Sequence, residues 1–362
     1  MSFTIIALTA LVFIIVYQIA KASEYATALR GEEKVKAQTN KLMAWLFLLM
    51  FFAGMWGIWV CHKGLIDKML PPSASIQGVA YDNMLKVTLT VTGIVFVVTQ
   101  ALLFWFAFRY QSNEKRTAFY YPHNNTLELL WTTVPAIVMT VLVVIGLRNW
   151  ASVTSEAPSN AQVVEIVGKQ FNWLVRYPGL DGRLGKRDFR KISDKDNVLG
   201  LLWDEKTNLD DVILENGEVH LVKGRPVKMI IGSRDVIHDV GLPHFRFKMD
   251  AVPGITTTIW FTPRYSTAYM KQYTNNPNFV YEISCDQMCG KGHYSMRGTV
   301  VVHETQEEFD TWLKGQKSYY AINFGPKEGA SDSTANPAAA ADSTKTVKMN
   351  SNATATIAAV KH

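Results

Sequence analysis

Long apolar runs occupy the first 150 residues of the chain, whereas the rest alternates short apolar blocks with turn residues. Four runs lack charged residues and have roughly the 20 residues that a helix needs to cross a bilayer. They are Phe3–Ala20, Leu42–Val60, Val87–Phe108 and Leu129–Leu147. We therefore predict four transmembrane helices, with a lipid bilayer around this part of the chain.

The first apolar run has the position of a secretory signal peptide but lacks its other marks. No basic segment precedes the run, and no A-x-A-like cleavage site follows it. We therefore interpret this run as a retained helix.

Basic residues are unevenly distributed among the predicted loops. Five Lys or Arg lie in 21–41 and three in 109–128, against three in the intervening loop 61–86. Cytoplasmic loops carry the excess of positive charge, so the first two loops are expected inside. The N-terminus and everything after Leu147 then lie outside, which in a bacterium is the periplasmic side of the inner membrane.

Beyond Asn149 the pattern changes to that of a β domain. Val163–Tyr177 is predicted to form two strands with a break near Gly168. Further strands, rich in β-branched residues and bounded by Gly or Pro, are expected at Val227–Ile231, Gly254–Thr262, Phe279–Ser284 and Gly298–His303. Thr305–Leu313 opens like a capped helix. Many short strands indicate a Greek-key barrel or sandwich, so the fold class is membrane-anchored α + β.

Two segments depart from the strand pattern. Residues 194–218, the acidic segment, hold eight acids against Lys195 and Lys206. The acids are Asp194, Asp196, Asp204, Glu205, Asp210, Asp211, Glu215 and Glu218. We interpret the segment as a solvated insertion that could steer a basic partner through Asp210 and Asp211. Residues 321–362 turn rich in Ala, Ser, Thr and Asn and are predicted to be a disordered tail.

Composition excludes some functions. The net charge is +6, but no basic cluster alternates with aromatic residues, so nucleic-acid binding is not expected. The chain has three cysteines and no C-x-x-C-H motif, so it should carry no covalently attached c-type haem.

The stretch from Ser284 to Gly298 carries the candidate chemistry, because its side chains are soft or borderline metal ligands. It contains Cys285, Cys289, His293 and Met296 within twelve residues. Such ligands suit copper, and two thiolates in one loop could bridge two copper ions. A second imidazole is needed, and His238 is the leading candidate.

Two other interpretations of the cysteines stay open. A cysteine pair in an oxidising compartment commonly forms a disulfide. Cysteine with histidine can also hold structural zinc, although zinc would have no use for Met296.

At these residues the chain resembles subunit II of haem-copper cytochrome c oxidases. That family carries a dinuclear copper A loop with the pattern C-x-E-x-C-G-x-x-H-x-x-M and an upstream D-V-x-H-x-x-x-x-P. Asp235–His238 and Pro243 match the upstream pattern, and Lys248–Gly254 matches the K-x-D-x-x-P-G that follows. The resemblance covers about residues 85–315. One position departs from it, since Gln287 replaces the family's Glu.

The resemblance implies a ligand set for two copper ions. Cys285 and Cys289 would bridge the metals, and each metal would take one imidazole. The remaining ligands would be weak, so that the implied set is His238, Cys285, the backbone carbonyl of Gln287, Cys289, His293 and Met296. In the family the Glu side chain also helps to bind magnesium, and the uncharged amide of Gln287 puts that ion in question here.

The resemblance also implies a domain organisation. Residues 62–150 would hold the family's transmembrane hairpin (87–108 and 129–147), and 151–320 an extracytoplasmic cupredoxin-like domain. Residues 1–61 would then add two extra helices (3–20 and 42–60), which would serve packing or assembly, or dock a partner respiratory complex.

Three residues outside the loop are also candidates. Glu128 opens the family's E-x-x-W-T-x-x-P pattern, whose Glu gathers protons for subunit I; the alternative is a solvated interfacial carboxylate. Phe171 and Trp173 occupy the aromatic positions of the family's G-x-Q-W-x-W, where electrons arrive; the alternative is simple strand packing.

The implied function is electron transfer from cytochrome c, or from a tethered cytochrome c domain, to the haem and copper centre of subunit I. Oxygen reduction and proton pumping would take place in that other chain. Two alternatives remain at this point: the copper-bearing small subunit of a nitric oxide reductase, and a metal-free structural subunit of a quinol oxidase.

Overall fold

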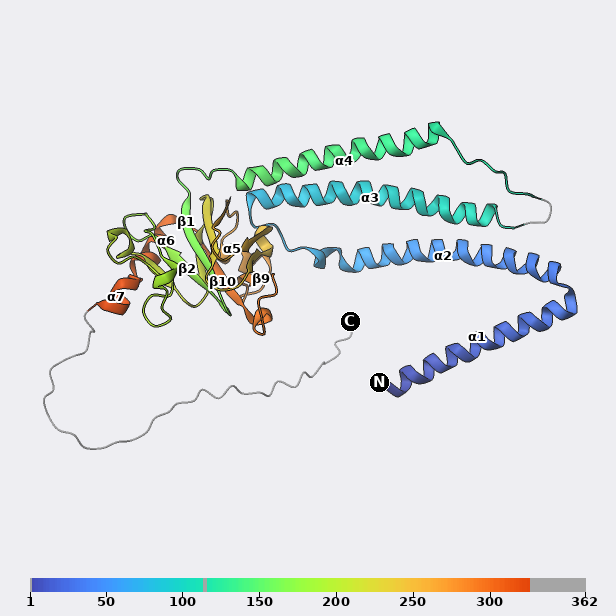
Figure 1. Cartoon of the computed structure of the whole chain (residues 1–362), viewed down its shortest axis with the longest axis horizontal. Helices are drawn as coiled ribbons and strands as arrows, with labels where there is room; N and C mark the ends of the chain where they lie inside the picture. The colour runs from blue at the N-terminus through green and yellow to red at the C-terminus, as the bar shows by residue number, and fades with distance from the viewer. Residues whose placement is uncertain (1, 113–115, 326–362) are drawn as a thin grey trace. The chain divides into compact units, whose positions relative to one another are not determined.

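The computed structural model describes residues 2–112 and 116–325 of the chain. Its first half consists of four long helices, α1 (Ser2–Arg30), α2 (Glu32–Met69), α3 (Ile76–Arg109) and α4 (Asn125–Thr154) (Figure 1). Each helix contains one of the predicted apolar runs and is long and apolar enough to cross a membrane. The expectation of four spanning helices is confirmed.

The expected loop at 21–41 is itself almost entirely helical. Only Gly31, with φ 86°, separates α1 from α2. Charge marks where a helix leaves the bilayer and not where the helix ends, because charged residues are good helix formers. Both helices therefore continue beyond their apolar runs.

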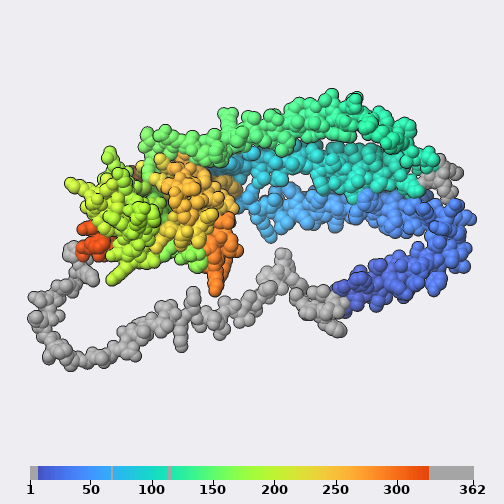
Figure 2. Space-filling view, in the orientation of Figure 1, coloured from blue at the N-terminus to red at the C-terminus, as the bar shows by residue number. Residues whose placement is uncertain are grey.

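Aromatic contacts hold α2 against α3. The rings of Trp45 and Phe108 lie 4.7 Å apart, and those of Phe47 and Phe104 lie 4.2 Å apart. Figure 2 shows the blue surface of α2 lying along the cyan surface of α3. Most other apolar side chains of the helices are exposed in the single chain, as expected for surfaces that face lipid or partner subunits.

The second half is a β sandwich of two five-stranded mixed sheets. One sheet has the order β3 (Val212–Leu214), β2 (Asn172–Tyr177), β1 (Gln162–Lys169), β5 (Val227–Ser233) and β8 (Thr257–Phe261). The other has the order β4 (Glu218–Val222), β10 (Arg297–His303), β9 (Tyr281–Cys285), β6 (His238–Leu242) and β7 (Phe247–Ala251). The fold class, four membrane helices followed by a cupredoxin-like β domain, is confirmed.

Shorter elements complete this domain. They are the helices α5 (Thr267–Tyr273), α6 (Gln306–Lys314) and α7 (Tyr319–Phe324), and the 3-10 turns Phe189–Lys191, Lys206–Asn208, Pro243–Phe245 and His293–Ser295. The predicted cap of α6 is present, since the Glu308 amide donates to the Thr305 hydroxyl.

The expected tail begins with structure. Residues 321–324 belong to α7, because Tyr319, Tyr320 and Phe324 pack their rings around Trp203. Residues 326–362 of the expected tail lie outside the described part of the chain.

The acidic segment is not a solvated insertion. Its Val198, Leu199, Leu201 and Ile213 form a second small core with Val167, Leu174 and Tyr319. Because side chains alternate along a strand, β1 and β2 turn one face toward the sandwich core and the other toward this segment. The segment is thus a structural layer over the first sheet.

Asp211 is fully buried and cannot serve in a docking surface. It accepts from Nε of Arg176, at 2.8 Å, and from that residue's Nη2. Arg176 also binds Glu165 at 2.9 Å and the Asn208 side chain. Burial raises the pKa of Asp211 to about 6, although the charge of Arg176 acts in the opposite direction. The proposed steering role of Asp210 and Asp211 is therefore wrong for Asp211.

Polar contacts join the start of α3 to the β domain. The Ser75 hydroxyl donates to the carbonyl of Phe245 at 2.6 Å and also caps α3. Arg246 donates to both carboxylate oxygens of Asp82, at 2.7 and 3.1 Å. Since Phe245 and Arg246 lie between β6 and β7, this joint ties the strand that begins at His238 to a membrane helix.

Candidate metal centre

The predicted ligands come from neighbouring strands of one sheet. His238 is the first residue of β6, and Cys285 is the last residue of β9. These strands are paired, with Val240 opposite Cys285. The segment Cys285–Met296, the metal loop, then connects β9 to β10. The two distant ligand segments therefore meet at the same end of one sheet.

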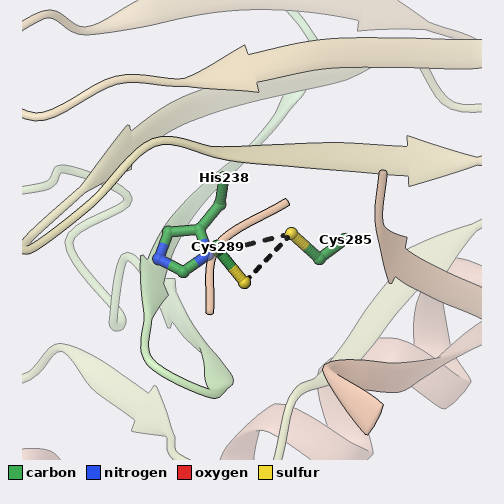
Figure 3. A group of neighbouring side chains, drawn as sticks. All are labelled: His238, Cys285 and Cys289. Atoms are coloured by element: carbon green, nitrogen blue, oxygen red, sulfur yellow. Dashed lines mark hydrogen bonds between the residues drawn. The ribbon is translucent and has the colours of Figure 1, made fainter. Parts of the chain in front are cut away.

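The sulfur and imidazole groups converge on one point, as Figure 3 shows for His238, Cys285 and Cys289. The two Sγ atoms are 3.8 Å apart. Cys285 Sγ lies 3.8 Å from His238 Nδ1, and Cys289 Sγ lies 3.7 Å from His293 Nδ1. Each thiol thus faces its own imidazole.

Met296 and Gln287 complete the surroundings of the thiols. Met296 Sδ lies 3.9 Å from Cys289 Sγ, and the Gln287 carbonyl oxygen lies 3.1 Å from Cys285 Sγ. Met296 is fully buried, whereas the side chain of Gln287 is exposed. Only the backbone of Gln287 therefore turns toward the cluster.

The cysteines are not joined in a disulfide in the described structure. Their sulfur separation of 3.8 Å is far beyond the 2.05 Å of an S–S bond. It is still less than twice a typical metal–thiolate bond of about 2.3 Å, so both sulfurs can reach one metal. The two sulfurs are therefore placed to share a metal ion.

Asp235 orients His238. His238 Nε2 lies 2.8 Å from Asp235 Oδ1, which leaves Nδ1 to face Cys285. Burial alone would raise the pKa of Asp235, but hydrogen bonds from the Gln170 amide, His238 and the Val236 amide hold that pKa below its usual range. An ionised acceptor of this kind fixes the tautomer of a ligand histidine and raises its basicity.

Glycine makes room for the ligands at two places. A Cβ on Gly168 would approach Cδ2 of His238 to 2.5 Å, so β1 can lie under the imidazole only without a side chain there. A Cβ on Gly292 would come within 2.4 Å of the Phe171 ring. Phe171 therefore packs directly against the metal loop.

The two candidate aromatic residues differ in exposure. Trp173 is fully buried, and its ring meets that of His238 edge to face at a centroid distance of 6.0 Å. Phe171 keeps 38% of its surface exposed. A partner protein can therefore touch Phe171 but not Trp173.

Burial disfavours the thiolate form of Cys289. Burial raises the pKa of Cys289 to about 11, and the adjacent Cys285 adds to the shift. A metal ion must displace such protons in order to bind thiolate. Loading the site therefore releases protons.

Glu128 is not near this cluster. It lies exposed in the first turn of α4, whereas the β domain follows the other end of that 30-residue helix. The structure leaves its predicted role untested.

Sequence reasoning missed three contributors to the site. They are Asp235, Gly168 and Gln170, whose side chain donates to the Cys289 carbonyl at 2.6 Å. The acid three residues before the ligand histidine was a usable signal, because a ligand imidazole commonly donates its second N–H to a carboxylate.

Comparisons with protein families agree with the two halves of the chain. Residues 64–149 match the family described as "Cytochrome C oxidase subunit II, transmembrane domain". Residues 162–304 match "Cytochrome C oxidase subunit II, periplasmic domain".

Individual relatives cover most of the chain. The "Alternative cytochrome c oxidase subunit 2" of Bradyrhizobium diazoefficiens is 36% identical over 242 residues, which are 67% of this chain and 82% of the relative. The "Cytochrome c oxidase subunit 2" of Thermostichus vulcanus is 24% identical over 310 residues, covering 71% of this chain and 80% of the relative. Among solved structures, the periplasmic domain of subunit II of cytochrome oxidase from Bradyrhizobium japonicum matches at 22% identity and a TM-score of 0.29, over 44% of this chain and 95% of that one.

Proposed function

Because the chain belongs to the cytochrome c oxidase subunit II family, we propose that its cluster is the dinuclear copper A centre of such an oxidase. As a subunit of the oxidase complex, the chain takes electrons from cytochrome c and passes them to subunit I. The observation that carries the copper assignment is the pair of free thiols, each facing an imidazole, with the Met296 thioether beside them.

The protein part of the centre is suited to fast electron transfer. His238, Cys285, Cys289 and Met296 are all buried, so water is largely excluded from the ligands. His238 and Cys285 belong to β6 and β9, and the amide of Cys285 donates to the Met296 carbonyl at 3.1 Å, which closes the metal loop. Ligands fixed in this way move little. When bound, copper held by these residues would supply one-electron chemistry.

The electron donor is proposed to dock over the metal loop. Phe171 is exposed there, and the exposed apolar residues Val236, Ile237, Met288 and Tyr294 lie beside the ligands in sequence. Exposed apolar patches mark interaction sites. A cytochrome c that covers Phe171 would be separated from the metal loop by the Phe171 ring.

The membrane topology follows from the same assignment. The β domain is periplasmic, so the connection between α3 and α4 lies on the cytoplasmic side and the N-terminus on the periplasmic side of a bacterial inner membrane. Glu128 then lies at the cytoplasmic surface, where we propose that it supplies protons to subunit I. Replacing Glu128 with Gln should slow oxygen turnover without changing the copper spectrum; unchanged turnover across a pH series would contradict this role.

Magnesium binding by the side chain of Gln287 is independent of the copper assignment. The side chain of Gln287 offers a neutral oxygen, and a carboxylate is the better ligand for a hard cation. Any magnesium ion at this position would be held without a charge from Gln287, and the copper assignment does not depend on it.

Metal analysis of the purified complex tests the copper proposal. We expect two copper ions per chain and a mixed-valence electron paramagnetic resonance signal. Cys285→Ser should abolish that signal. Cys61→Ser is the matched control, because Cys61 is an exposed cysteine on α2. One copper ion per chain, or an unchanged signal in Cys285→Ser, would overturn the dinuclear assignment.

A further inference from the structure

A basic cavity lies at the cytoplasmic ends of α2 and α3. It has a volume of about 700 Å³ and is lined by Lys36, Lys41 and Arg116, with Glu33 as its acid. Lys36 and Lys41 form no ion pair with a described residue, and both are exposed. Among the described lining residues, three cations therefore stand against the single carboxylate of Glu33.

An apolar groove of about 590 Å³ continues from this cavity. Its lining includes Met43, Phe47, Met50 and Ala107. The two spaces share Asn40, Gln111 and Ser112, so they form one site with a polar and an apolar part. The combined space is complementary to a phospholipid, because its basic part can hold an anionic headgroup and its apolar part can hold a hydrocarbon chain.

The change from polar to apolar lining coincides with the expected surface of the bilayer. In α2 the charged turns end at Lys41, and the apolar run starts at Leu42. In α3 the apolar run ends at Phe108, whose ring contacts Trp45 of α2 at 4.7 Å. Tryptophan is enriched at this depth, where headgroups meet hydrocarbon. The polar cavity therefore lies at headgroup level and the groove at acyl-chain level.

We propose that this site binds an anionic phospholipid. Its phosphate is recognised by Lys36, Lys41 and Arg116, and one acyl chain follows Met43, Phe47 and Ala107 between the helices. Basic pockets between membrane helices on the cytoplasmic side suit anionic headgroups, since each Lys or Arg near the surface contributes about 1 kcal/mol. The lipid would join the extra N-terminal helices to the hairpin that the family shares.

Native mass spectrometry of the full chain in detergent tests the site. Phosphatidylglycerol and phosphatidylcholine with identical acyl chains are titrated separately. We expect phosphatidylglycerol to bind at least fivefold more tightly. Lys36→Gln/Lys41→Gln should abolish this preference, because each lost charge costs about fivefold in affinity. Lys63→Gln, at the opposite end of α2, is the matched control and should change nothing.

A second variant tests the binding of the lipid acyl chain separately from the recognition of its headgroup. Ala107→Leu narrows the apolar groove and should weaken both lipids while leaving the preference for phosphatidylglycerol intact. Equal binding of the two lipids by the unmodified chain, or a preference that survives in Lys36→Gln/Lys41→Gln, would overturn the proposal.

The assembled oxidase provides the last check. Phosphatidylglycerol with a photoreactive acyl chain should label peptides that contain Met43 or Ala107. If a cross-linker placed at residue 107 instead captures another subunit and no lipid label appears, a protein helix occupies the groove and the lipid proposal fails.

Discussion

The metal loop and the acidic segment are both short stretches with one dominant chemistry, yet they use it in opposite ways. In the metal loop the reactive groups converge. The Cys289 thiol lies less than 4 Å from the Cys285 thiol, the His293 imidazole and the Met296 thioether. In the acidic segment the acids diverge. Asp194 pairs with Lys169 and Arg234, Glu205 with Lys186, and Asp211 with Arg176.

The difference comes from what each pattern requires. A metal site needs several ligand types at fixed spacing, and few other structures would explain Cys, Cys, His and Met together. A run of acids does not require its members to lie together in the fold, because each carboxylate can pair with a different cation. The first pattern therefore predicts a site, whereas the second predicts only a charge.

The largest effect should come from the buried acids. Arg176→Met would leave Glu165 and Asp211 buried without their shared cation, and breaking such a pair typically costs about 3–5 kcal/mol. Pulse proteolysis of the full chain in urea measures the loss. Arg190→Met is the control, since Arg190 is 75% exposed and its partner is 3.9 Å away. A loss as small as that of the control would mean that the acidic segment is not a structural layer.

The next effect concerns the metal loop. Asp235→Ala should weaken copper binding by about 10- to 100-fold, the usual cost of losing the acceptor behind a ligand histidine. Competition with a copper chelator measures this loss. Asp196→Ala, in the acidic segment, should leave copper affinity unchanged. Equal copper affinities of the two variants would remove Asp235 from the site.

The same contrast explains how far the sequence could predict the fold. The four helices were predictable because an apolar run of bilayer length has few alternatives. Strands β3, β4, β6 and β7 were missed. In β6 and β7, H-D-V-G-L and F-K-M-D-A contain acids and glycine instead of a β-branched run. Their strand geometry comes from pairing with each other and with β9. Such tertiary pairing overrides local propensity.

Within the site, the candidate ligands could be named from the sequence, whereas the residues that surround them could not. Cys285, Cys289, His293 and Met296 share one loop, so their spacing is visible in the sequence. Gly168 and Gln170 lie more than a hundred residues earlier, and only the sandwich brings β1 under His238. Exposure separates Phe171 from Trp173 in the same way, because Phe171 lies in the turn before β2 whereas Trp173 lies within β2 and belongs to the main core.

A smaller effect on function is expected at Phe171, and comparison with Trp173 shows which of the two aromatic residues meets the donor. Phe171→Ala should slow electron transfer from cytochrome c about five- to tenfold while the copper content stays intact, as for an interface anchor worth more than 1 kcal/mol. Trp173→Ala should instead destabilise the fold by about 3–5 kcal/mol, because it empties a core position. Stopped-flow oxidation of cytochrome c and pulse proteolysis separate the two outcomes. Normal stability with slow transfer in Trp173→Ala would reverse the assignment.

The smallest effect should come from the acids that remain free. Asp196 and Asp204 form no ion pair with any residue in 2–112 or 116–325, and neither do Asp210 and Glu215. Asp196 and Asp204 therefore still resemble the steering charges that the acidic segment first suggests. At physiological salt their field reaches only about 8 Å. Asp196→Asn/Asp204→Asn should therefore change the rate with a basic cytochrome c less than about twofold, and Lys195→Gln should change it slightly in the opposite direction. Stopped-flow rates over a salt series measure both. A rate loss of tenfold or more at low salt in Asp196→Asn/Asp204→Asn would instead show that the acidic segment guides the donor.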